Sequence, residues 1–107
     1  MASVRMTQVT ALILRAVASG RRYGFDVMDA CDLPSGTVYP ALRRLERAGV
    51  LRSGWEDVDE ARSEGRPRRR TYALTEAGRD ALREADAKLQ EIRRLLGDFP
   101  PATAGEA

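Results

Sequence analysis

The sequence predicts a mainly helical fold with one small β-hairpin, and three observations support this prediction. Residues 6–48 contain three short segments whose apolar positions recur at helical spacing. Residues 50–58 and 70–74 read as two strands on either side of a polar loop at 59–67. A long helical segment then runs from about residue 76 to 96. The order helix, helix, helix, strand, loop, strand, long helix is that of a winged helix–turn–helix domain with an added C-terminal helix.

The three helices of the first half are bounded by recognisable start and stop residues. The first covers residues 6–19 and is apolar on more than one face, which predicts burial from two sides. The second covers about 24–30, and the turn after it contains Asp32, which tolerates a left-handed backbone conformation. The third begins with Ser35 as its predicted N-cap and runs to about residue 48, before a glycine.

The long C-terminal helix bears an aliphatic seam. Thr75 is its predicted N-cap, and apolar residues then recur in a heptad-type pattern at Leu82, Ala85, Leu89, Ile92 and Leu96. Such a seam is too apolar to face water, so we expect a homodimer interface along it, to which Val9 and Ile13 of the first helix contribute. The predicted organisation is a winged helix–turn–helix domain over 1–75, a dimerisation helix over 76–99 and a disordered tail over 100–107.

Composition argues against several classes of protein. The chain has no histidine and a single cysteine, Cys31, so it can form neither an internal disulfide nor a cysteine- or histidine-rich metal site, and the commonest general base is missing. We therefore expect no enzymatic activity and no cofactor, and we interpret Cys31 as a small buried turn residue, with a redox sensor as the alternative. No apolar run reaches the roughly 18 residues of a membrane span and no signal-peptide pattern is present, so we expect a cytoplasmic protein without membrane contact.

Hydroxyl and basic side chains gather at the start of the third predicted helix, in a pattern typical of DNA recognition. In a helix–turn–helix unit the second helix enters the major groove, with its N-terminal residues near the base edges. Here those residues are Ser35, Thr37 and Tyr39, with Arg43 and Arg44 one turn later. Hydroxyls can contact phosphates or bases, and arginine can bridge guanine O6 and N7. An ordinary helical hairpin with a solvated charged face is the alternative interpretation of this segment taken alone.

The predicted hairpin loop holds a second basic cluster. The net charge of the chain is only +2, so the position of the basic residues matters more than their number. Four arginines lead into the second strand: Arg66, Arg68, Arg69 and Arg70. Arginine on a flexible wing can enter the minor groove of DNA. The preceding acidic residues, among them Asp57 and Glu64, would repel phosphate, so a solvated loop is the alternative. We interpret Trp55 as a packing residue of the hairpin.

Several linked motifs resemble the PadR family of transcriptional regulators. They span about residues 8–85 and comprise Tyr23-Gly24-Phe25, the segments 35–46 and 48–51, Trp55-Glu56, the arginine-rich segment 65–72 and Leu74-Thr75-Glu76-Ala77-Gly78. The resemblance implies a homodimer that binds palindromic operators, usually as a repressor. It also implies that the helix containing Gly36-Thr37-Val38-Tyr39-Pro40 reads the major groove and that Tyr23 sits near the DNA backbone. In many members a small molecule releases the DNA.

Two departures from the family pattern affect these expectations. The segment between the Tyr23-Gly24-Phe25 motif and Gly36 is shorter than in many members, so the second helix must be abbreviated. The C-terminal helix has no tryptophan of the kind that lines a drug pocket in some short members. Because its seam is aliphatic, we expect no strong site for planar aromatic compounds there. The sequence does not identify a small-molecule effector.

The sequence as a whole predicts a sequence-specific DNA-binding transcriptional regulator whose partners are double-stranded DNA and a second copy of the chain. Such a protein would be associated with the nucleoid when bound to DNA. The alternative is a winged-helix module that binds another protein without contacting DNA. The basic residues at the start of the third helix and in the wing argue against that alternative.

Overall fold

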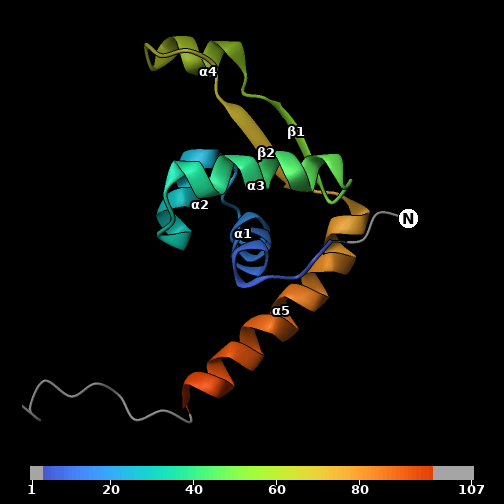
Figure 1. Ribbon diagram of the computed structural model, residues 1–107. Helices are drawn as coiled ribbons and strands as arrows, with labels where there is room; N and C mark the ends of the chain where they lie inside the picture. The colour runs from blue at the N-terminus through green and yellow to red at the C-terminus, as the bar shows by residue number, and fades with distance from the viewer. Residues whose placement is uncertain (1–3, 98–107) are drawn as a thin grey trace, which may run out of the picture.

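The computed structural model describes residues 4–97 and confirms the predicted fold class (Figure 1). Its body consists of α1 (Gln8–Ala18), α2 (Gly24–Cys31) and α3 (Ser35–Arg47). The wing that projects from this body consists of β1 (Leu51–Trp55), α4 (Val58–Ser63) and β2 (Arg70–Leu74), and α5 (Glu76–Gly97) crosses α1 and continues past the body. The predicted tail at 100–107 and the last two residues of the predicted dimerisation segment lie outside the described residues.

The core forms where α1, α2, α3 and the base of the wing meet. Its largest fully buried side chains are aliphatic and come from α1, α3 and β1: Ile13, Leu14, Leu42, Leu45 and Leu51. Helix α1 is buried from two sides, as predicted, because α5 packs on it from one side and the other helices of the body pack from another. The four predicted helices match the observed ones to within two residues at each end, since periodic apolar residues mark both the helices and the core.

The turn between α2 and α3 confirms one capping prediction and corrects another. Asp32 ends α2 in the left-handed conformation, with φ 54°. Ser35 is the first residue of α3 rather than its N-cap: Pro34 occupies that position, and no side chain caps the helix. Pro34 suits the position because its backbone is extended, with φ −74° and ψ 160°, and the N–H that it lacks is not needed there.

The wing is an antiparallel hairpin whose connection is partly helical. Trp55 lies opposite Arg70 at its outer end, and the first strand ends there rather than at residue 58, as the sequence had indicated. The predicted polar loop contains α4 instead. Asp57 caps this helix by accepting a hydrogen bond from the backbone N–H of Asp59 at 2.7 Å, and Ala61 is its one buried residue. Acidic residues in the first turn further favour a short helix at this place.

Helix α5 begins in close contact with the base of the hairpin. The hydroxyl of Thr75 accepts a hydrogen bond from the N–H of Gly78 at 3.0 Å, which confirms the predicted cap, and it donates to the carbonyl of Gly49 at 2.6 Å. A Cβ on Gly78 would lie only 2.1 Å from the carbonyl oxygen of Val50, so only glycine permits this crossing. Within residues 4–97, no helix has both the length and the apolar character needed to cross a membrane.

Candidate nucleic-acid interface

Helix α3 buries one face and exposes the other. Val38, Leu42 and Leu45 anchor it in the core. The predicted recognition residues gather on the opposite side: Ser35, Gly36, Tyr39, Pro40, Arg43 and Arg44 are exposed and Thr37 is half-buried. Arg47, which was not in the predicted set, extends this face by one turn. No acidic side chain in the described part of the chain lies within ion-pair distance of these three arginines.

The start of α2 is joined to both α3 and the wing. Tyr23 forms an isolated antiparallel bridge with Thr71 of β2, and the N–H of Tyr72 donates to the carbonyl of Arg22 at 2.7 Å. A Cβ on Gly24 would lie 2.5 Å from the ring of Tyr39, so the absence of a side chain leaves room for this ring against the start of α2. The Tyr23-Gly24 pair thus contacts both the wing and the recognition helix.

A buried carboxylate organises the wing. Glu56 is only 3% exposed and accepts a bidentate pair of hydrogen bonds from the guanidinium of Arg66. It also accepts from Arg69, through the backbone N–H at 3.2 Å and the guanidinium at 3.1 Å, and from the hydroxyl of Tyr23 at 3.4 Å. The guanidinium of Arg69 stacks on the ring of Tyr23, 3.7 Å from its centroid. Buried charge requires such partners, and here one carboxylate holds two cations in fixed positions.

The ionisation of this cluster follows from its hydrogen bonds. The bonds from Arg66, and then those from Arg69, lower the pKa of Glu56 to about 2, although burial acts in the opposite direction. The same carboxylate raises the pKa of Arg66 and of Arg69. All three groups are therefore charged at neutral pH, so the carboxylate cancels one of the two positive charges and the cluster carries a net charge of +1.

The four predicted wing arginines thus fall into two pairs. Arg66 and Arg69 are half-buried and bound to Glu56. Arg68 and Arg70 stay exposed: the Nε of Arg68 donates to the carbonyl of Glu56 at 2.9 Å, and Arg70 donates to Ser53 Oγ at 2.8 Å and lies 3.7 Å from a Glu46 carboxylate oxygen. Sequence reasoning missed Glu56 as the partner, and its only signal was the adjacent Trp55-Glu56 motif.

The tip of the wing is acidic. In place of a flexible loop, α4 stands at the end of the hairpin remote from α5, and four exposed acidic residues lie on and beside it: Asp57, Asp59, Glu60 and Glu64. Carboxylates at this place repel phosphate, so the tip is poorly suited to the minor groove. A helix thus stands where a polar loop was predicted, and the acidic residues that were expected to repel phosphate lie on and beside it.

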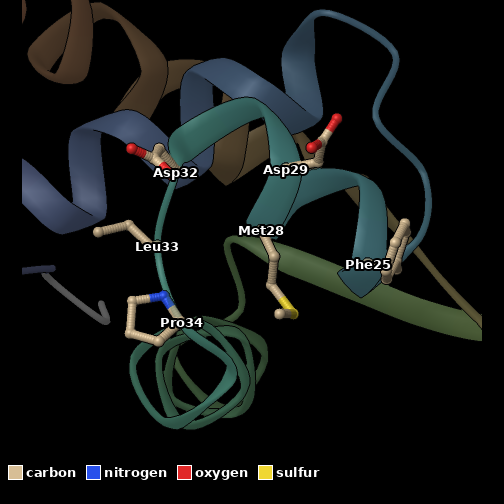
Figure 2. A pocket seen from close by; sticks show the side chains of 6 residues that line it. All are labelled: Phe25, Met28, Asp29, Asp32, Leu33 and Pro34. Atoms are coloured by element: carbon tan, nitrogen blue, oxygen red, sulfur yellow. The ribbon is translucent and has the colours of Figure 1, made fainter.

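Two surface hollows flank the helix–turn–helix and differ in charge. One of about 590 Å³ lies between α3 and the wing and is lined by Tyr39, Arg43, Glu46, Arg47, Arg70 and Tyr72. The other, of about 460 Å³, lies by the turn between α2 and α3, where Phe25, Met28, Leu33 and Pro34 line it together with Asp29 and Asp32 (Figure 2). The first hollow is mainly basic and the second is acidic, so only the first suits a polyanion.

The predicted dimer seam is partly used inside the chain. Ile13 and Ala85 are 0% exposed and belong to the core of the chain, where α1 packs on α5, and they are therefore not available to a partner. Val9, Leu82, Leu89 and Ile92 are half-buried. Leu96 is 65% exposed, and its neighbour Leu95 is 44% exposed. The apolar surface that remains open therefore lies mainly toward the C-terminal end of α5.

Trp55 and Cys31 differ in how far they are buried. Trp55 is 56% exposed, which corrects its interpretation as a packing residue. Cys31 is half-buried at the end of α2, and burial raises the pKa of its thiol. Neither residue lines the hollow of about 380 Å³ beside α5, whose lining residues are Arg15, Asp86, Leu89, Gln90 and Arg93, without an aromatic residue.

Comparison with known proteins agrees with this geometry. Residues 13–84 match the transcriptional regulator PadR-like family. The transcriptional regulator Rv3488 of Mycobacterium tuberculosis is 44% identical over 70 residues, which are 65% of this chain and 60% of that protein. The match therefore spans less than two thirds of that relative.

Solved structures show the same architecture. A PadR family transcription regulator of Clostridium difficile superposes with a TM-score of 0.68 and 26% identity, over 87% of this chain and 98% of that one. BpsR of Bordetella bronchiseptica, whose DNA binding is regulated by 6-hydroxynicotinic acid, superposes with the same TM-score and 21% identity, over 89% of this chain and 68% of that one. This second likeness concerns the fold alone.

Proposed function

The chain belongs to the PadR-like family of transcriptional regulators, and we propose that it represses transcription as a homodimer bound to a palindromic operator. The family consists of DNA-binding regulators and not of enzymes. The observation that supports the proposal best is the exposed face of α3. It presents hydroxyls and three arginines that have no acidic partner within residues 4–97, on a helix whose other face is anchored in the core.

We assign the DNA-contacting residues by exposure and charge. The exposed face of α3 enters the major groove, where arginine can read guanine. The residues assigned to this contact are Ser35, Gly36, Thr37, Tyr39, Pro40, Arg43 and Arg44. Tyr23 lies beside the DNA backbone, and Arg68 and Arg70 of the wing contact phosphates. Arg66 and Arg69 support this surface through Glu56 rather than by contacting DNA. The region 1–75 thus binds DNA in the cytoplasm, and α5 serves dimerisation.

The dimer is proposed from the surface that the protomer leaves open. Ile92, Leu95 and Leu96 extend beyond the α1 contact, and burying them against a second copy removes apolar surface from water. A two-fold axis through this region would present two copies of α3 to successive major grooves, roughly 34–36 Å apart. Leu96→Glu should shift the protein toward monomer in sedimentation at micromolar concentration, whereas Arg94→Ala, nearby on the same helix, should not. A wild-type protein that sediments as a monomer would contradict the dimer.

The function is tested by selecting duplexes from a random pool with the wild-type protein. We expect enrichment of a palindrome whose half-sites are about one helical turn apart. The Arg43→Ala/Arg44→Ala variant should lose the selected duplex, and Arg83→Ala is the matched control, because Arg83 is exposed on α5 away from the proposed surface. Failure of the wild-type protein to enrich any sequence would contradict the proposal.

A protein-binding module is distinguished from a DNA-binding one by salt. Binding through phosphates releases counterions, so the logarithm of the association constant should fall steeply and linearly with the logarithm of the salt concentration. A duplex affinity that is independent of salt would favour the protein-binding alternative.

A further inference from the structure

The place of Trp55 in the hairpin points it toward the recognition helix. In the antiparallel register Trp55 pairs with Arg70, two positions beyond the pair of Ser53 and Tyr72. Tyr72 is buried, and Ser53 donates a hydrogen bond to Glu46 of α3, so this face of the hairpin is the one turned to α3. Side chains alternate along a strand, and Trp55 and Arg70 therefore form the first pair on this face that lies beyond the body.

Trp55 is exposed and has two guanidinium groups close to its ring. The guanidinium carbon of Arg70 lies 5.2 Å from the indole ring centroid and that of Arg68 lies 5.9 Å from it, both within cation–π range. Within residues 4–97 the indole N–H has no hydrogen-bond acceptor, and more than half of the side chain faces solvent. Two cations and a neutral donor are thus gathered on one outward surface.

Hydrogen bonds within the wing hold both arginines while leaving donors free. Arg68 uses its Nε on the carbonyl of Glu56, and Arg70 uses one terminal nitrogen both on Ser53 Oγ and, at 3.7 Å, on a carboxylate oxygen of Glu46. A guanidinium has five N–H donors, so each arginine retains terminal N–H groups for a further acceptor. Neither arginine shares the carboxylate of Glu56, which is occupied by Arg66 and Arg69.

We propose that Arg68, Trp55 and Arg70 form a clamp for one DNA backbone phosphate in each half-site, with the indole N–H as the third donor. The proposal rests on the DNA-binding function proposed above. Charge-assisted hydrogen bonds from arginine suit a phosphate, and the acidic α4 confines the wing's contact to this face of the hairpin. The clamp fixes the register of α3 on the duplex without reading sequence.

The clamp makes separate predictions for the neutral donor and for the charged ones. Trp55→Phe keeps an aromatic ring beside the arginines but removes the N–H, so operator affinity should fall roughly fivefold, as for one ordinary hydrogen bond, while the salt slope stays unchanged. Arg70→Ala should lower the magnitude of that slope by about 0.9 for each phosphate that the variant no longer neutralises. Anisotropy of a labelled operator, measured over a series of salt concentrations, gives both quantities.

A direct readout is available because Trp55 is the only tryptophan of the chain. In the wild-type protein, saturation with the selected operator should protect Trp55 from quenching by iodide. Thermal unfolding of the Trp55→Phe variant should match the wild type, because the side chain is largely exposed. Full iodide accessibility of Trp55 in the saturated complex, or wild-type affinity of Trp55→Phe, would overturn the clamp. Either result, obtained on a selected operator, leaves the DNA-binding function standing, whereas failure of the selection itself removes that function.

Discussion

Helix α3 and the wing differ in what holds them in place. Helix α3 is anchored by aliphatic side chains that are fully buried between the other helices, among them Leu42 and Leu45. Outside its base, the wing buries few apolar residues, and its geometry depends on Glu56 and the two arginines bound to it. Apolar burial is insensitive to direction, whereas hydrogen bonds to a carboxylate are directional and respond to pH.

This difference gives the same residue type two tasks. The arginines of α3 have no acidic partners in the described part of the chain, so their charge is available to DNA. Arg66 and Arg69 use theirs to fix the position of the wing. The number of arginines in the wing therefore overstates the number available to bind a polyanion, because arginines that are paired with a buried carboxylate must be left out of the count.

The largest expected effect concerns the anchoring of α3. Leu42→Ala should lower the free energy of unfolding by about 2–5 kcal/mol, because it leaves a cavity in a fully packed region. Val58→Ala on the wing helix α4 is the matched comparison, since Val58 is largely exposed, and it should change stability by less than about 0.5 kcal/mol. Denaturant unfolding measures both, and equal losses would mean that the two regions are anchored alike.

A second prediction separates the two sets of arginines. Arg43→Ala or Arg44→Ala should weaken operator binding by about 1–3 kcal/mol if the side chain reads a base, with an unchanged unfolding midpoint. Arg66→Ala should instead loosen the wing, because it removes the bidentate partner of a buried carboxylate. Anisotropy titrations and hydrogen exchange at β1 and β2 distinguish these outcomes. Arg66→Ala with an intact wing but abolished DNA binding would place Arg66 on the DNA instead.

Acid should act on the wing before it acts on α3. The folded-state pKa of Glu56 is lowered to about 2 from an ordinary value of 4.5. Its contribution to stability is therefore fully present above about pH 4.5 and is lost as pH falls from there toward 2. The protection factor of the amide of Glu56, which donates to the carbonyl of Arg69 at 2.8 Å, should fall over this range relative to the intrinsic exchange rate at each pH. In Glu56→Gln the wing should exchange fast at neutral pH already and show no such dependence.

The smallest expected effect concerns the exposed start of α3. A Cβ on Gly36 would meet nothing within 4 Å, so Gly36→Ala should raise stability by roughly 0.5–1 kcal/mol through reduced chain entropy. The same methyl group would stand between the helix backbone and the floor of the major groove and should weaken operator binding. A variant that is stabilised and binds with unchanged affinity would show that the backbone at Gly36 stays clear of the DNA.

The sequence was sufficient for the elements that rest on local rules. Apolar periodicity predicted the helices of the body and α5, and turn chemistry predicted the left-handed Asp32 and the Thr75 cap. Helix α4 was not predicted, because a six-residue helix with one buried alanine has no detectable apolar periodicity. The preference for a hydroxyl at the N-cap predicted Ser35 there, but the extended backbone of Pro34 places the proline at that position and Ser35 inside the helix.

The candidate site was less accessible to sequence reasoning, because its organisation is tertiary. Glu56 meets Arg66 and Arg69 across a hairpin, at separations for which no periodicity exists. The aliphatic seam of α5 was visible, but its division between α1 of the same chain and any second copy depends on how the two helices cross. Exposure decided the assignment of Trp55, and exposure of a lone tryptophan cannot be read from its neighbours in sequence.

The tight crossing of Gly78 over the carbonyl of Val50 makes α5 a lever arm. The N–H of Thr75 also donates to that carbonyl at 3.1 Å, so the start of the helix is held against the base of the hairpin. Helix α5 has 22 residues and is therefore roughly 33 Å long. In the proposed dimer, a small change in the angle between the two α5 helices would move the two wings relative to each other, and the distance between the wings would change.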